Sequence, residues 1–203
     1  MAYNRHGYVE EGTTLGRPMK DLRGYLNRGE IERLLKATKC YRDYLLLKGL
    51  YYTGRRVSEF IALRPEHIDE ESNQIQWHIL KKKDKDAQVL MLEHAKYMEE
   101  LLGYIKEAKV FSYNRIFPIT RQRVHQIIRE CGERADLLWL GKKKIHPHHL
   151  RHSFAINFIR HLKNPGDIVK LQRRLQHTSI GVTSHYLQFS TEEDKQILQD
   201  AFD

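Results

Sequence analysis

The chain has only two cysteines in 203 residues, Cys40 and Cys131, and they lie far apart without CxxC spacing. Such isolated cysteines predict neither a disulfide framework nor a zinc site, and they fit a reducing cytosol. Long apolar runs are also lacking: no segment approaches about 18 apolar residues, and residues 1–20 contain no apolar signal region. These absences argue against a secreted or membrane-spanning protein and favour a cytoplasmic one.

The chain has fewer acidic residues than basic ones. Asp and Glu number 26 against 35 Lys and Arg, so the formal charge is +9 and the isoelectric point is about 9.5. A basic domain has the electrostatic character of a nucleic-acid-binding protein, although charge alone does not identify the partner. The length and the hydrophobic share of 40% are typical of one folded domain or two small ones.

The N-terminal part begins without a pattern and then becomes helical. Residues 1–24 are polar and unperiodic, which predicts a flexible basic arm. Asn27 and Glu30 have the spacing of a capping box, and the apolar residues after them predict a helix. Residues 41–54 are apolar on nearly all sides, which predicts a buried central helix that Gly54 ends.

The segment after Gly54 combines apolar and charged residues. Val57, Phe60 and Ile61 fall on one helical face, whereas Arg56 and Glu59 fall off it. We therefore expect the apolar face to pack against the core and both charged side chains to lie outside that contact.

Two short β-rich runs then interrupt the helical pattern. The runs, residues 74–80 and 87–92, lie on either side of the basic stretch KKKDKD and predict a small antiparallel hairpin. Beyond them a basic loop, LGKKKI, lies between helical patterns. The expected helices cover residues 93–108, 121–135 with Thr120 as N-cap, 147–158, 167–176 and 191–202. The fold class is therefore α+β, mainly α, with one small antiparallel sheet.

Arg151 lies among four histidines between residues 146 and 152. On a helix, His148 and Arg151 are three residues apart and share a face, whereas Leu150 and Phe154 belong to a different, apolar face. We therefore expect Arg151 to be displayed beside His148 and not buried. Its planar guanidinium suits bidentate contact with phosphate oxygens, so one interpretation of this segment is a phosphate pocket.

Two other interpretations of the histidine cluster compete with a phosphate pocket. His148 and His152 have the i,i+4 spacing of two metal ligands on a helix. No Cys, Asp or Glu lies nearby to complete a metal site, and the adjacent Lys142, Lys143 and Lys144 would repel a cation, so no metal ligand is assigned. A solvated histidine surface is the second alternative.

Three segments of the chain together resemble one known family. TGRRVSEFIALR (53–64), HHLRH (148–152) and LQHTSIGVTSHYLQF (175–189) are similar to the signature boxes of tyrosine recombinases, the phage-integrase family. The usual forms of these boxes are TGxRxxELxxLR, HxLRHxxA and LGHxxxxxTxxYxH. The boxes occur in the family's order and with its nine-residue step from His177 to Tyr186.

The resemblance implies roles for seven residues. The catalytic positions fall on Arg56, His148, Arg151, His177 and the nucleophile Tyr186, with Glu59 as the acid that supports the first arginine. A catalytic lysine in the family's hairpin falls on Lys83, although the usual glycine beside it is missing. The implied fold is the DNA breaking-rejoining catalytic core that the family shares with type IB topoisomerases.

The implied reaction needs no cofactor, ATP or metal. Arg56 and Arg151 would hold the non-bridging oxygens of a DNA phosphate, where preorganised cationic donors stabilise the charge that develops. Tyr186 would attack to form a covalent 3′-phosphotyrosine. A tyrosine hydroxyl has a pKa of about 10, so it needs a base, and His148 is the candidate. Lys83 would protonate the departing 5′ oxygen.

Several residues near the boxes receive other interpretations. Arg55 is expected to be a surface arginine, because the family usually has an apolar residue there. His146, His149 and His152 are expected to support the pocket or to lie on the surface. Gln176 replaces the usual glycine of the third box, so the turn before His177 is expected to differ. The basic residues expected to contact DNA backbone are Lys81, Lys82, Lys85, Lys142, Lys143 and Lys144.

The resemblance also implies a domain organisation and partners. Residues 25–203 correspond to the catalytic domain, without the full core-binding domain that usually precedes it, so the chain is a minimal recombinase or an excised domain. The helix at residues 191–202 resembles the element that relatives dock onto a neighbouring protomer. We therefore expect a homo-oligomer, dimer to tetramer, on specific double-stranded DNA sites, with a possible accessory protein, in the cytoplasm in association with the nucleoid.

The leading functional hypothesis is a site-specific DNA recombinase, an integrase. A second enzymatic alternative is a DNA-relaxing activity like that of type IB topoisomerases. The third alternative is a DNA-binding accessory protein that has the fold but little activity.

Overall fold

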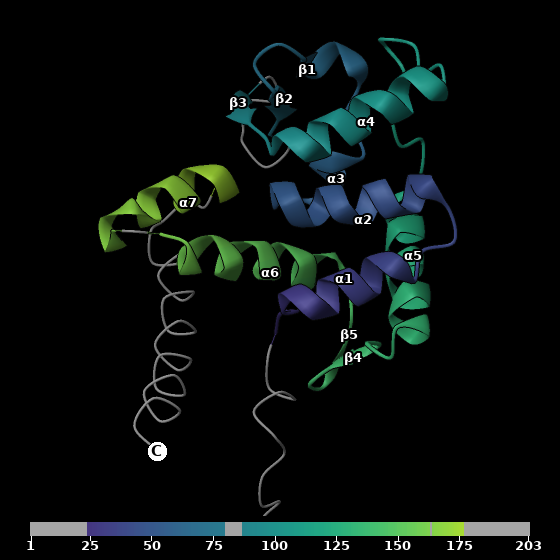
Figure 1. The fold of residues 1–203 in the computed structure, drawn as a ribbon, viewed down its shortest axis with the longest axis vertical. Coiled ribbons are helices and arrows are strands. Elements are labelled where there is room, and N and C mark those ends of the chain that lie inside the picture. The colour runs from purple at the N-terminus through teal and green to yellow at the C-terminus, as the bar shows by residue number, and fades with distance from the viewer. Residues whose placement is uncertain (1–23, 80–86, 163, 177–203) are drawn as a thin grey trace, which may run out of the picture.

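The computed structural model describes residues 24–79, 87–162 and 164–176 (Figure 1). The elements, in chain order, are α1 (Arg28–Lys36), α2 (Tyr41–Thr53), α3 (Val57–Phe60), the 3-10 helix η2 (Pro65–His67), β1 (Ile68–Asp69), β2 (Gln74–His78), β3 (Gln88–Leu92), α4 (Ala95–Glu107), α5 (Arg121–Arg134), β4 (Trp139–Leu140), β5 (Lys143–Lys144), α6 (Pro147–Arg160), the 3-10 helix η3 (Pro165–Asp167) and α7 (Ile168–Leu175). The predicted mainly helical α+β fold is confirmed. Within these residues, no helix combines the length and the apolar character that a bilayer crossing needs.

Helix α2 is the centre of the molecule, as its uniformly apolar sequence predicts. Its buried leucines contact α1, α3, α4 and α6, and in Figure 1 it lies between α4 on one side and α1 and α6 on the other. Gly49 permits the closest of these contacts, because a Cβ atom there would lie 2.2 Å from the side chains of Phe60 and Tyr97. Gly54 ends the helix in a left-handed conformation with φ of 63°, as predicted.

Helix α1 begins with the predicted capping box. The Asn27 side chain accepts a hydrogen bond from the N–H of Glu30 at 2.8 Å, and the Glu30 carboxylate accepts one from the N–H of Asn27 at 2.8 Å. Just before it, the N–H of Leu26 donates to Ser153 Oγ on α6 at 2.8 Å. These bonds fix the start of α1 against the helix that carries Arg151.

The β-rich segments form the predicted hairpin, with one more strand than expected. Strands β2 and β3 pair antiparallel in the register Trp77↔Val89, and β1 pairs with the other edge of β2. Trp77 is 1% exposed and packs against Phe60 of α3, so the inner face of the sheet closes the core above that helix. Strand β1 has two residues, too few for an alternating pattern to reveal it.

A second small sheet lies in the segment that was predicted to be a basic loop. Strands β4 and β5 pair antiparallel through Leu140↔Lys143, with Gly141 and Lys142 as a two-residue turn. Gly141 has a φ of 59°, a conformation that glycine adopts without steric cost and that tight hairpins require. The prediction of a single sheet is therefore wrong.

Helix α7 packs on α6 through a separate apolar cluster. Phe154, Ala155 and Ile159 of α6 meet Leu171 and Leu175 of α7, and all five are buried. This contact places the last turn of α7 beside the N-terminal half of α6. The predicted helix at residues 191–202 and all but the last residue of the predicted arm at residues 1–24 lie outside the described residues.

Candidate active site

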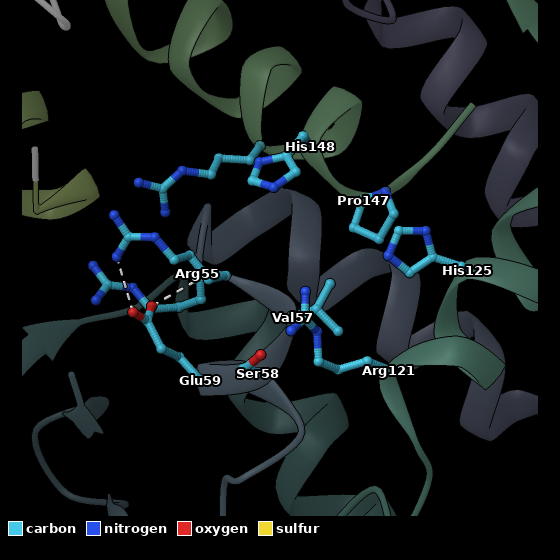
Figure 2. Close-up of a pocket in the computed structure, with 10 residues that line it drawn as sticks. Arg55, Val57, Ser58, Glu59, Arg121, His125, Pro147 and His148 are labelled. Atoms are coloured by element: carbon cyan, nitrogen blue, oxygen red, sulfur yellow. Dashed lines mark hydrogen bonds and ion pairs between the residues drawn. The ribbon is translucent and has the colours of Figure 1, made fainter. Parts of the chain in front are cut away.

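A pocket of about 340 Å³ opens where α3, α5 and α6 meet (Figure 2). Segments from the end of α2 to α3, the first turn of α5 and the first turns of α6 supply its walls. The lining residues are Arg55, Arg56, Val57, Ser58, Glu59, Arg121, His125, Pro147, His148 and Arg151. The pocket therefore brings together four of the predicted site residues, Arg56, Glu59, His148 and Arg151, from positions almost 100 residues apart in the chain.

Arg56 is held in place by Glu59, as the resemblance implies. Its Nη1 atom lies 2.9 Å from Glu59 Oε1, and its backbone N–H lies 3.3 Å from Glu59 Oε2. The Glu59 side chain is only 1% exposed, whereas that of Arg56 is 21% exposed. The expectation that Glu59 lies outside the apolar contact is wrong, because α3 is a single turn whose Glu59 side chain folds back over the N-terminus to reach Arg56.

Arg151 lines the pocket but is buried, so the expectation of an exposed arginine is wrong. It is 5% exposed, its Nη1 donates to the carbonyl oxygen of Gly54 at 2.6 Å, and its Nη2 donates to that of Leu175 at 2.5 Å. Helical spacing alone did not reveal this burial, because the covering residues come from the end of α2 and from α7. The two carbonyl contacts fix the guanidinium in one orientation.

The histidines before Arg151 build the start of α6. His146 is the N-cap and accepts a hydrogen bond from the N–H of His148, while the Nδ1 of buried His149 accepts one from the N–H of His146 at 3.1 Å. Burial lowers the pKa of His149 to about 3, so this ring is neutral at pH 7 and serves as an acceptor. His149 thus supports the pocket, whereas His148 is exposed and lines it (Figure 2).

Two lining residues on α5 were not singled out from the sequence. Arg121 and His125 lie one helical turn apart on α5 and border the pocket next to Pro147 (Figure 2). Burial, followed by the charges of Arg129 and Arg121, lowers the pKa of His125. The i,i+4 spacing of Arg121, His125 and Arg129, off the face that carries buried Val124, is the signal that would have found them.

Arg55 is a buried arginine and not the surface residue that was expected. It is 2% exposed, and its guanidinium lies 5.7 Å from the centre of the Trp77 ring and donates to the carbonyl oxygen of Arg174. Burial lowers its pKa to about 10, which leaves it charged at neutral pH. No local pattern could predict this burial, since Trp77 and Arg174 are distant from Arg55 in the chain.

The pocket suits a polyanion. Four arginines line it against one carboxylate, Glu59. Arginines held by buried partners need little rearrangement to meet an incoming charge, which is the condition for electrostatic stabilisation of a phosphoryl-transfer transition state. Among the described residues, no three His, Cys, Asp or Glu side chains are arranged to hold a metal ion.

Some predicted site residues are not in the described part of the chain. Those outside it are Lys81, Lys82, Lys83, Lys85, His177 and Tyr186. Lys142, Lys143 and Lys144 are exposed on the β4–β5 hairpin. Gln176, the last described residue, has a φ of 53°, so it adopts the left-handed conformation that a glycine at this position favours.

Comparison with protein families agrees with this geometry. The model of the phage integrase family matches residues 25–193, which include every segment that lines the pocket. The chain belongs to the phage integrase family.

Similar proteins and solved structures point to the tyrosine recombinases within this family. The chain is 33% identical to a tyrosine recombinase of Pseudothermotoga lettingae, over 83% of this chain and 57% of that protein. It is 30% identical to the tyrosine recombinase XerD of Staphylococcus aureus, over 84% of this chain and 60% of that protein. The chain thus spans little more than half the length of these relatives.

Two solved structures have the same fold. The XerA recombinase superposes with a TM-score of 0.67 at 26% identity, covering 88% of this chain and 65% of that one. The XerH site-specific recombinase, bound to a palindromic difH substrate in a post-cleavage complex, gives 0.66 at 25% identity, covering 87% of this chain and 52% of that one. The predicted family and fold are confirmed.

Proposed function

We propose that this chain is the catalytic part of a site-specific DNA recombinase that breaks and rejoins strands through a covalent 3′-phosphotyrosine. The observation that carries the proposal is the pocket in which Arg56, Arg151 and His148 converge. Two arginines with fixed orientations and one exposed histidine match the groups that a metal-independent phosphodiester transfer uses. The likeness to tyrosine recombinases over most of the chain supports the same reaction.

Each group in the proposed mechanism has a distinct task. Arg56 and Arg151 bind the non-bridging oxygens of the scissile phosphate, and His177 adds a hydrogen bond. Tyr186 attacks the phosphorus, His148 accepts its proton, and Lys83 protonates the departing 5′ oxygen. The energy of the broken bond is kept in the phosphotyrosine, so a 5′ hydroxyl of another strand reverses the step.

The DNA on either side of the scissile phosphate contacts basic residues around the pocket. Exposed Arg121 and Arg129 extend the positive surface along α5, and Lys142, Lys143 and Lys144 extend it along the β4–β5 hairpin. Such contacts neutralise phosphates without reading the sequence. On paired recombination sites the protein acts as a dimer to tetramer, in which the segment at residues 191–202, predicted to be helical from the sequence, joins neighbours.

Trapping the covalent intermediate tests the proposed reaction directly. In a nicked suicide duplex the short fragment that carries the released 5′ hydroxyl diffuses away and cannot reverse the step, so the protein–DNA adduct accumulates and is detected on a denaturing gel. We expect the adduct with the unchanged protein and with Tyr113→Phe, which removes the hydroxyl of an exposed tyrosine outside the pocket. We expect none with Tyr186→Phe, and an adduct that persists in that variant would contradict the proposal.

The same assay separates the alternative functions. Relaxation of plasmid that lacks any recombination site, with an adduct at many positions, would favour an activity like that of type IB topoisomerases. Sequence-specific binding without any adduct would favour a DNA-binding accessory protein.

A further inference from the structure

A buried ion cluster lies beside the pocket and joins three segments that are distant in sequence. Its members are Arg55, Glu93 and Arg174. Arg55 is 2% exposed, Glu93 is 5% exposed, and the Arg174 side chain is 17% exposed. They come from the loop before α3, the end of β3 and the last turn of α7. None of them is among the residues to which the sequence assigned a role in the reaction.

The Arg174 side chain fastens α7 to the three-stranded sheet. Its Nη2 forms an ion pair with Glu93, and its Nη1 donates to the carbonyl oxygen of Leu92 at 2.7 Å. Glu93 also accepts a hydrogen bond from the Trp77 indole at 2.9 Å. The guanidinium of Arg174 lies 5.6 Å from the centre of the Phe154 ring on α6. One side chain thus ties α7 to β3 and packs on α6.

The backbone of the same turn is tied to the pocket. The carbonyl oxygen of Arg174 accepts a hydrogen bond from Arg55, and that of the next residue, Leu175, accepts one from Arg151 at 2.5 Å. Carbonyl groups in the last turn of a helix lack partners within the helix, so these guanidinium groups complete them. The position of this turn therefore determines where the Arg151 guanidinium lies.

Burial disfavours the charged forms of two members of this cluster. Burial raises the pKa of Glu93 from 4.5 to about 7 against the opposing charges of Arg174 and Arg55, and burial lowers that of Arg55 to about 10. In both groups the cost of removing the charge from water exceeds the attraction of the partners. Buried ion clusters of this kind are often replaced by apolar residues without loss of stability, so their effect is on geometry.

We infer that Glu93 and Arg174 are positioning residues for the strand-transfer reaction, and that they act by fixing the last turn of α7 and, through the Leu175 carbonyl, the guanidinium of Arg151. The inference rests on the proposed function. A shift of the Leu175 carbonyl removes one of the two carbonyl contacts that orient Arg151 and tilts its donors away from the phosphate oxygens. Misplacement of about 1 Å at a reacting centre lowers rates by about a hundredfold.

Glu93→Gln is the variant that separates positioning from general damage to the fold. It keeps the size of the side chain and an acceptor for the Trp77 indole, but it removes the charge that holds Arg174. The measurement is the rate of adduct formation on suicide duplexes for the variant and the unchanged protein between pH 5.5 and 8.5. The ratio of the two rates cancels the titration of groups that both proteins share, His148 included.

The rate of the variant divided by that of the unchanged protein is expected to rise as the pH falls. At pH 8.5 Glu93 is charged, so we expect the variant to be slower by about tenfold or more. At pH 5.5 Glu93 is protonated in the unchanged protein, so the ratio rises toward one. The charged and titratable groups that face Glu93 are Arg174, Arg55 and Tyr97, and neither Arg55, with a pKa of about 10, nor Tyr97, whose pKa burial raises further, titrates in this window.

Two controls complete the test. Glu100→Gln removes a carboxylate from the Lys48 ion pair on α4, outside the pocket, and its ratio is expected to stay near one at every pH. In the combined variant Glu93→Gln, Arg174→Leu, both partners of the ion pair lose their charge while Arg55 stays in the pocket lining, so we expect a folded protein with a slow adduct rate at all pH values. A constant ratio for Glu93→Gln, or a full rate in the combined variant, would overturn the inference.

Failure of the proposed function is distinguishable from failure of this inference. If the unchanged protein forms no adduct on any DNA that it binds, the proposed reaction is wrong. Hydrogen exchange at the amides of residues 171–176 then decides the positioning role alone. We expect faster exchange in Glu93→Gln than in Glu100→Gln, and equal exchange in the two variants would overturn it.

Discussion

At the scale of single residues, the pocket depends on buried groups that hold its arginines. Glu59 is the clearest case, because its carboxylate is 1% exposed and contacts both the side chain and the backbone of Arg56. Removing one partner of a buried ion pair leaves the other uncompensated. The orientation of Arg56 therefore depends on an acid whose side chain is almost completely buried.

Glu59→Gln is expected to lower the free energy of unfolding by about 1–3 kcal/mol, because the charge-assisted contact to Arg56 is lost in a buried place. Urea denaturation measures the change. The matched control is Glu66→Gln, which breaks the exposed pair between Arg64 and Glu66 and is expected to cost less than about 1 kcal/mol. Equal losses in the two variants would contradict the role assigned to Glu59.

Gln176→Gly is expected to stabilise the folded chain by about 1 kcal/mol, because Gln176 adopts a left-handed φ of 53° that costs a residue with a Cβ atom about 1–2 kcal/mol. Among the described residues its buried amide also finds no hydrogen-bond partner. Lys109→Gly is the control for the backbone effect alone, since Lys109 is exposed and has a φ of 50°. Urea denaturation should give a smaller gain for the control, and the reverse order would refute the argument.

At the scale of elements, the helices were predictable and the shortest strands were not. The capping box of α1 and the left-handed Gly54 after α2 are local signals, so the sequence was sufficient for both. Strands β4 and β5 have two residues each and form through a glycine turn, which leaves no periodicity to detect. The positions of Arg56 and His148 followed from the signature boxes, but the burial of Arg151 and Arg55 depends on α7, which no local pattern shows.

The first turns of α6 are expected to make the protein sensitive to acid. Burial lowers the pKa of His149 to about 3 and that of His152 to about 4, against 6.5 in the unfolded chain. Between pH 6.5 and 4 the unfolded chain therefore binds protons that the folded chain excludes, so stability is full above pH 6.5 and falls as the pH falls. Glu93, with its raised pKa, acts in the opposite direction between pH 4.5 and 7, but one carboxylate opposes two histidines.

Urea denaturation at several pH values between 7.5 and 4.5 measures this slope. His149→Gln keeps an acceptor for the N–H of His146 and removes one titrating ring, so we expect a flatter dependence on pH than in the unchanged protein. His161→Gln, at the exposed C-terminal end of α6, is the control and should leave the slope as it is. Parallel slopes for His149→Gln and the unchanged protein would exclude His149 as the cause.

At the scale of the whole molecule, the charge of +9 predicts DNA binding that weakens steeply with salt. We expect Arg121→Gln to lower the slope of log K against log salt concentration by about 1, because one phosphate contact is lost beside the pocket. The control Lys106→Gln makes the same change of charge on α4, away from the pocket lining, and should change the slope by much less. Fluorescence anisotropy with a labelled duplex measures both, and equal effects would mean that only net charge matters.

The pocket is lined by residues from the end of α2 to α3, the start of α5 and the start of α6. Its Arg151 also donates a hydrogen bond to the carbonyl oxygen of Leu175 in the final turn of α7. A ribosome must therefore release almost all of the described chain before these arginines meet. A nascent or truncated chain that ends before α7 has Arg56 and Glu59 but lacks the carbonyl that orients Arg151. During synthesis, the Arg151 guanidinium therefore gains its carbonyl contact from Leu175 only after α7 has folded against α6.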